Sequence, residues 1–96
     1  MIYNFEWNPN KAKTNIRKHK VSFEEAATVF RDPAALTIFD PDHSETGDRW
    51  LTIGISGAGK LLLVCHTYKE VDPETAIIRI FSGRKATESE KRQYGE

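Results

Sequence analysis

Residues 49–68 read RWLTIGISGAGKLLLVCHTY, two apolar runs separated by a glycine-rich turn. Apolar side chains alternate along Arg49–Ser56, and a second apolar run extends over Lys60–Tyr68. The glycines between them are typical of a tight hairpin turn. Asp72-Pro73-Glu74 predicts another turn, which leads into a strand over residues 75–82. Three successive strands with short connections predict an antiparallel meander.

Two helices are expected before this meander. Asn8-Pro9 combines an N-cap residue with proline at the first helical position, and it predicts a helix to about His19. Ser22 and Glu25 are spaced as a capping box. An apolar face follows at i, i+3, i+4 and i+7, formed by Phe23, Ala26, Ala27 and Phe30. The second helix can therefore pack one side on a sheet, and Asp32-Pro33 ends it.

The remaining elements complete an α+β order. Short strands are expected at residues 2–7 and 36–40. Thr87 and Glu90 form a second capping box, which begins a helix to about Tyr94. With 96 residues, we expect a single domain over 1–96. The order predicts an antiparallel sheet with the N-terminal helices packed on one face and a short C-terminal helix.

Composition excludes several classes of protein. The longest apolar run, Leu61–Cys65, is far too short to span a bilayer, and the N-terminus lacks a signal-peptide pattern. The single Cys65 excludes an internal disulfide and a cysteine-based zinc site, and its apolar neighbours place it in the core. A cytoplasmic location is the expected default.

The formal net charge is zero, but the charges are segregated along the chain. Residues 11–20 carry five Lys or Arg and no acid, whereas residues 40–48 carry four acids and no Lys or Arg. A local basic surface for a nucleic acid is therefore compatible with a neutral chain. Two solvated surfaces would give the same pattern.

Cations also gather at the end of the last predicted strand. Residues 75–87, which follow the turn at 72–74, contain Arg79, Arg84 and Lys85 and no acidic residue. A charge within an apolar strand is costly unless it is paired or faces water, so Arg79 belongs on the face opposite its isoleucine neighbours. The cluster suggests an anion site, most plausibly for phosphate. A structural ion pair of Arg79 with Glu6, Asp40 or another acid is the alternative.

Histidines are the natural candidates for proton transfer near neutral pH. His66 lies on one face of a predicted strand, where it either transfers protons or is hydrogen-bonded packing. His19 ends a basic helix, where a capping or surface role is favoured.

Two further patterns are weaker. GISGAGKL at 54–61 resembles a phosphate-binding loop, but Leu61 stands where Ser or Thr would bind Mg²⁺, and the context predicts a hairpin turn. The loop of residues 40–48 offers ligand types but lacks EF-hand spacing, so a solvated loop is expected. Its candidate ligands are Asp40, Asp42, His43, Glu45 and Asp48. We expect neither a metal nor a cofactor.

Five blocks resemble the BrnT family of bacterial toxins across nearly the whole chain. They are FEWNPNKA (5–12), NIRKHKVSFEEA (15–26), DPDHS (40–44), RWLTIG (49–54) and RIFSGRKAT (79–87). The resemblance implies a RelE-like fold and a ribonuclease toxin that lowers translation when free. It also implies a BrnA antitoxin with a ribbon-helix-helix DNA-binding part. The complex would repress its own operon and contact DNA chiefly through the antitoxin.

Three positions depart from the family pattern. Lys20 stands where Gly would form a left-handed helix cap, which predicts a weaker or different cap. Asn8 replaces Asp and should still cap the helix. Gly83 replaces Ala and is expected to loosen a loop that carries Arg84 and Lys85.

The cation cluster and the resemblance together predict RNA cleavage without metal. Cations would stabilise the charge on the phosphorane, and a base and an acid would move protons. The predicted catalytic residues are His66 for proton transfer and Arg79, Arg84 and Lys85 for the phosphate. The predicted substrate-binding residues are Lys11, Arg17, Lys18, Tyr68 and Tyr94, the tyrosines being second choices for proton transfer. A non-catalytic module within a DNA-binding repressor complex is the alternative function.

Overall fold

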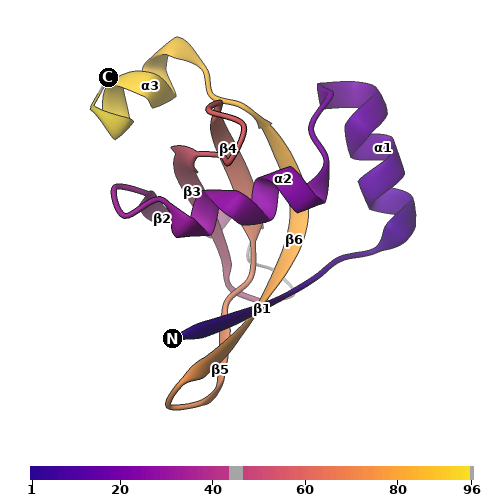
Figure 1. Cartoon of the computed structure of the whole chain (residues 1–96), viewed down its shortest axis with the longest axis vertical. Coiled ribbons are helices and arrows are strands. Elements are labelled where there is room, and N and C mark those ends of the chain that lie inside the picture. Colours follow the sequence, from indigo (N-terminus) through magenta and orange to yellow (C-terminus); the bar gives the residue numbers. More distant parts are fainter. Residues whose placement is uncertain (44–46, 96) are drawn as a thin grey trace.

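The computed structural model describes residues 1–43 and 47–95. It has the predicted order of elements with one added strand, β5, and two single turns of 3₁₀ helix (Figure 1). The elements are β1 (Ile2–Glu6), α1 (Pro9–His19), α2 (Phe23–Thr28), η1 (Val29–Arg31), β2 (Leu36–Asp40), η2 (Pro41–His43), β3 (Arg49–Ile55), β4 (Leu61–His66), β5 (Lys69–Asp72), β6 (Thr75–Lys85) and α3 (Glu88–Tyr94).

The six strands form one mixed sheet in the order β1-β6-β4-β3-β2, with β5 paired to β6. The antiparallel meander of β3, β4 and β6 is confirmed, and β2 is antiparallel to β3. The prediction of a wholly antiparallel sheet is wrong at one edge, because β1 runs parallel to β6. Alternation of side chains predicts that a strand forms but not its direction, and α1 with α2 supplies the long return that a parallel neighbour needs.

Strand β6 is longer than predicted and runs on to Lys85. β1 pairs only with its first half, residues 75–79, and α1 lies beside the second half (Figure 1). There the buried Asn15 acts as a strand partner: its Nδ2 donates to the Gly83 carbonyl at 2.8 Å, and the Gly83 N–H donates to its Oδ1 at 3.2 Å. The expected loose loop at Gly83 is therefore wrong. The residue is buried, and a Cβ there would lie 3.2 Å from the Cβ of Ala26.

The main core lies between α2 and one face of the sheet, which α2 crosses in Figure 1. The predicted apolar face of α2 is confirmed, with Phe23 and Ala26 fully buried and Ala27 and Phe30 packed at the margin. The sheet contributes Leu62, Val64, Ile78 and Ile80. Burying side chains of this size favours folding by about 1.5–3 kcal/mol each.

The helix caps largely follow the sequence. Asn8 accepts from two backbone N–H groups at the start of α1, and Lys20 adopts the left-handed conformation, φ 60°, that glycine would adopt at lower cost. Ser22 caps α2, but the Glu25 carboxylate accepts from the Ser56 hydroxyl at 2.9 Å and so ties α2 to the β3–β4 turn. The capping box of α3 is complete. Within residues 1–43 and 47–95, no helix is both long and apolar enough to cross a bilayer.

Candidate functional site

The side of the sheet opposite α2, here named the open face, carries a cationic groove. Ile78 and Ile80 point into the core, so Arg79 and Phe81 lie on the open face, as the alternation predicts. A groove of about 440 Å³ runs beside Phe81 and is bordered by α1, β2, β3, β4 and β6, and the buried Asp40 of β2 is among its lining residues. It forms because α1 continues past the edge of β6 and brings its own side chains alongside the sheet.

Three cations from distant parts of the chain border this groove. The Nζ of Lys11 lies 5.3 Å from the Phe81 ring centroid, and the Cζ of Arg49 lies 4.0 Å from it. Arg84 lines the same groove from β6. Sequence reasoning missed Arg49, because nothing at the start of a strand distinguishes it. Its one signal is register, which sets it opposite Asp40 of β2.

Arg84 is held in a fixed orientation by α3. Its Nη1 and Nη2 donate to the two carboxylate oxygens of Glu90 at 2.8 and 2.9 Å. These bonds raise the pKa of Arg84 and lower the pKa of Glu90. Glu90 also accepts from the Thr87 N–H, so the capping box positions the carboxylate that positions the guanidinium. Glu90 engages one N–H of each terminal nitrogen, so Arg84 would bind a phosphate through its charge and its other N–H groups, held in one orientation.

The other two predicted cations of β6 are placed differently. Arg79 donates to Glu6 at 3.3 Å, which is the structural ion pair that the sequence left open. Its side chain is 40% exposed, so the pair contributes little to stability. Lys85 is exposed at the end of β6. Of the predicted cations of this strand, Arg84 is the one that the structure brings to Lys11.

His66 is not brought to the cations. It is 2% exposed and lies on the α2 side of the sheet, the face opposite the groove. Its Nδ1 lies 3.0 Å from the Thr67 carbonyl, which can only accept, so Nε2 accepts from the Thr52 hydroxyl at 2.7 Å. Burial lowers the pKa of His66 and keeps the ring neutral.

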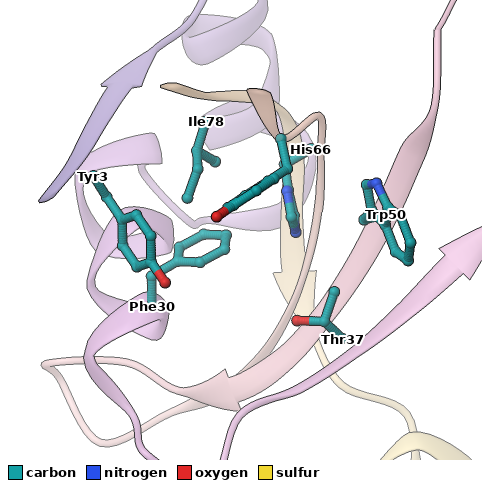
Figure 2. Close-up of a pocket in the computed structure, with 7 residues that line it drawn as sticks. Tyr3, Phe30, Thr37, Trp50, His66 and Ile78 are labelled. Atoms are coloured by element: carbon teal, nitrogen blue, oxygen red, sulfur yellow. The ribbon is translucent and has the colours of Figure 1, made fainter. Parts of the chain in front are cut away.

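His66 lines a second hollow, the aromatic pocket, of about 270 Å³ (Figure 2). Its other lining residues are Tyr3, Phe30, Thr37, Trp50, Tyr68 and Ile78. The Phe30 and His66 rings meet edge to face at 4.8 Å. The hydroxyl of Tyr68 lies 3.4 Å from Glu70, and desolvation together with this carboxylate raises the pKa of Tyr68. Tyr68 therefore belongs with His66 and not with the cations.

Tyr94 serves as an anchor for α3. Its hydroxyl donates to Asp32 in a short hydrogen bond, and Asp32 also accepts from the backbone N–H groups of Ile55 and Ala34. These bonds lower the pKa of Asp32. The arrangement ties α3 to the end of β3 and to the segment after η1.

Helix α1 adds a hollow that adjoins the groove. It is lined by Lys18 and His19, and it shares Lys11, Phe81 and Ser82 with the neighbouring surface. Lys11 and Lys18 are seven residues apart and so lie on one face of the helix. Arg17 is exposed, and its guanidinium lies 3.5 Å from the Thr14 hydroxyl. The sequence predicts a capping or surface role for His19. In the structure His19 also lies close to β6, the strand that carries Arg84.

The structure also bears on three smaller predictions, which concern Cys65, the hairpin turn and the acidic loop. Cys65 was expected in the core, but it is half-buried on the open face, where it lines the groove; burial raises the pKa of its thiol. The hairpin turn at 56–60 is confirmed, with Ser56 donating to the Lys60 carbonyl and Gly59 at φ 79°. In the acidic loop, Glu45 lies outside the described residues. Among the described residues, no group of three His, Cys, Asp or Glu could hold a metal ion.

The sequence matches a family model described as ribonuclease toxin, BrnT, of type II toxin-antitoxin system, over residues 7–90. The chain belongs to the BrnT family. Membership implies ribonuclease activity and an antitoxin partner. The crystal structure of the Brucella abortus ribonuclease toxin BrnT is similar, with a TM-score of 0.62 and 22% identity, covering 92% of this chain and 100% of that one. At that identity the likeness shows a shared fold. No curated protein matches the chain.

Proposed function

We propose that this BrnT toxin cleaves RNA without a metal ion in the groove of the open face. The observation that carries the proposal is the convergence of Lys11, Arg49 and Arg84, from α1, β3 and β6, on one groove, with Lys11 and Arg49 over the Phe81 ring. Asp40 and Glu90 offset part of this positive charge, and a phosphate placed between the three cationic side chains would interact with all of them. A polyphosphate chain such as RNA is the anion that a ribonuclease family provides.

The cleavage step follows from the chemistry of RNA. The 2′-hydroxyl attacks the adjacent phosphorus, a base removes its proton, and an acid protonates the departing 5′-oxygen. Charge develops on the non-bridging oxygens of the phosphorane, where fixed cations are most effective. Arg84, preset by Glu90, and Arg49 would hold those oxygens, and Lys11 would bind a neighbouring phosphate. Lys18 would continue the track along α1.

Proton transfer is assigned to His19 in this proposal. The sequence-based choice, His66, lies across the sheet with both ring nitrogens engaged inside the protein. His19 borders the hollow that shares Phe81 and Ser82 with the groove, and imidazole is the side chain best suited to proton transfer near pH 7. The direct role predicted for Arg79 is tested by the Arg79→Gln substitution in the Discussion, and the role predicted for Lys85 stays a prediction.

The cellular part of the proposal rests on the family. RNA cleavage would lower translation, and a BrnA-like antitoxin with a ribbon-helix-helix part would neutralise the toxin. The complex would repress its own operon, with the antitoxin contacting DNA, and the toxin would act in the cytoplasm. The alternative is a member that binds antitoxin but has lost its chemistry.

The test is incubation of partner-free protein with RNA in EDTA, with and without ribosomes. Lys11→Ala is compared with Lys13→Ala, an exposed lysine on the same helix that does not border the groove. We expect cleavage by the wild type and by Lys13→Ala, and roughly tenfold or greater loss for Lys11→Ala, as for one lost charge-assisted contact to a neighbouring phosphate. Cleavage abolished by EDTA would contradict the metal-free step. No cleavage under either condition would favour the binding module.

A further inference from the structure

The aromatic pocket has a chemistry unlike that of the groove. It lies at the end of the sheet that α2 leaves uncovered, and strand residues on the α2 side line it together with Phe30 of η1 and Tyr68 of the β4–β5 connection (Figures 1 and 2). Tyr3 and Tyr68 are 39% and 40% exposed, and Phe39, 41% exposed, extends the surface by packing edge to face on Trp50 at 5.1 Å. The pocket is therefore a concave aromatic surface in contact with solvent.

The Thr37 hydroxyl and the His66 ring, both in the pocket wall, are hydrogen-bonded within the protein. Because Thr52 donates to His66, the Thr37 hydroxyl donates to Thr52 across 2.9 Å. The hydrogen-bond chain thus runs inward from Thr37 to His66, so these two side chains offer a polar ligand no free donor. A volume of about 270 Å³ exceeds the roughly 150 Å³ that holds benzene in an apolar protein cavity. It has room for one large apolar side chain.

The charge next to the pocket disfavours RNA. No Lys or Arg is among its lining residues, in the part of the chain that the structure describes, and the charge at its rim is the Glu70 carboxylate beside the Tyr68 hydroxyl. A phosphate chain would meet a like charge there. Buried aromatic side chains with a charged rim are instead characteristic of binding hot spots between proteins.

We propose that the aromatic pocket binds an apolar side chain of the antitoxin, with a basic residue next to it in the antitoxin sequence pairing with Glu70. The inference rests on the proposed function only in requiring the antitoxin partner that family membership implies. It places antitoxin contact and RNA cleavage on opposite faces of one sheet. Substitutions can therefore separate the two activities.

The test uses the antitoxin encoded with this toxin, purified separately, and measures its binding to toxin variants by calorimetry. Tyr3→Glu puts a carboxylate in the pocket wall, and Glu70→Lys reverses the rim charge. Val71→Glu is the matched control, because Val71 is 48% exposed and does not line the pocket. A Trp7→Phe background leaves Trp50 as the fluorescent reporter of occupancy, since the chain has two tryptophans.

We expect Tyr3→Glu to weaken antitoxin binding at least tenfold, Glu70→Lys to weaken it several-fold, and Val71→Glu to bind as the wild type does. All three should keep RNA cleavage, and Trp50 emission should shift to the blue on binding. Wild-type affinity in both Tyr3→Glu and Glu70→Lys would overturn the proposal. Loss of RNA cleavage with antitoxin binding intact would assign the pocket to a nucleobase and overturn it too. A wild type that cleaves no RNA would leave the binding result unaffected.

Discussion

The two faces of this sheet differ in chemistry although the same strands supply both. On β3, Arg49 borders the cationic groove and the next residue, Trp50, lines the aromatic pocket. On β4, Cys65 lies in the groove and His66 in the pocket. Successive side chains of a strand point to opposite faces, so one strand can carry two unrelated surfaces. Adjacent residues of β3 and of β4 therefore belong to different sites.

We expect the largest effect from a substitution in the cationic groove of the open face. Arg49→Gln removes a guanidinium from the groove and should lower kcat/KM for RNA by about 10²-fold or more, as loss of a donor to developing charge does. Arg79→Gln should cost less than about tenfold, because Arg79 does not border the groove. Both are measured with a fluorescent oligonucleotide after circular dichroism confirms folding. Equal losses would extend the phosphate site along β6, as the sequence predicts.

A second substitution loosens α1, which carries Lys11 to the open face. Asn15→Ala leaves the carbonyls of Val21 and Gly83 and the Gly83 N–H without their partner in a buried site. We expect the free energy of unfolding to fall by about 2 kcal/mol, within the usual range for buried unsatisfied groups. Urea denaturation measures it, with Asn4→Ala, an exposed asparagine of β1, as the control. A change equal to that of the control would show that Asn15 does not hold α1.

A pH profile sharpens the description of the aromatic face. Burial lowers the pKa of His66 in the folded state, so below about pH 6.5 the unfolded chain binds a proton that the native protein excludes. The free energy of unfolding should therefore fall as pH decreases from 6.5, by at most about 1.4 kcal/mol per pH unit from this group. His66→Gln should show a smaller decline between pH 6.5 and 5.

Between pH 6.5 and 5, the two carboxylates whose pKa values are shifted do not change their protonation. The pKa values of Asp32 and Glu90 are lowered, so their contributions are present above the usual carboxyl range and are lost only as pH falls through the lowered values. Parallel profiles for the wild type and His66→Gln would mean that His66 is not held neutral by burial.

The smallest effect concerns the track along α1. Lys18→Ala should reduce the slope of log kcat/KM against log salt by about 0.7, the contribution of one contact to a single-stranded phosphate. Lys13→Ala should leave the slope unchanged. The same slope in both variants would remove Lys18 from the RNA path.

The sequence predicted most of the fold because its signals are local. Period-two alternation, the caps at Asn8 and Thr87, and the apolar face of α2 each depend on residues within a few positions. The direction of β1 and the added strand β5 were not predicted, since neither depends on local pattern.

The site was less accessible to prediction, because its residues meet only through tertiary contacts. Arg84 was found, but its partner Glu90 and the neighbour Arg49 were not. His66 and Arg79 were grouped because both lie on apolar strands, yet the register places His66 across the sheet from the groove.

The most direct test of the account is to ask which face binds RNA. A ¹⁵N-labelled protein is titrated with an oligonucleotide whose 2′-hydroxyls are methylated, so that it binds without being cleaved, and amide shifts are recorded. We expect shifts concentrated at Lys11, Phe81 and Ser82, with Trp50 and Tyr68 unchanged. Shifts concentrated at Trp50 and Tyr68 would contradict the assignment of the open face to RNA.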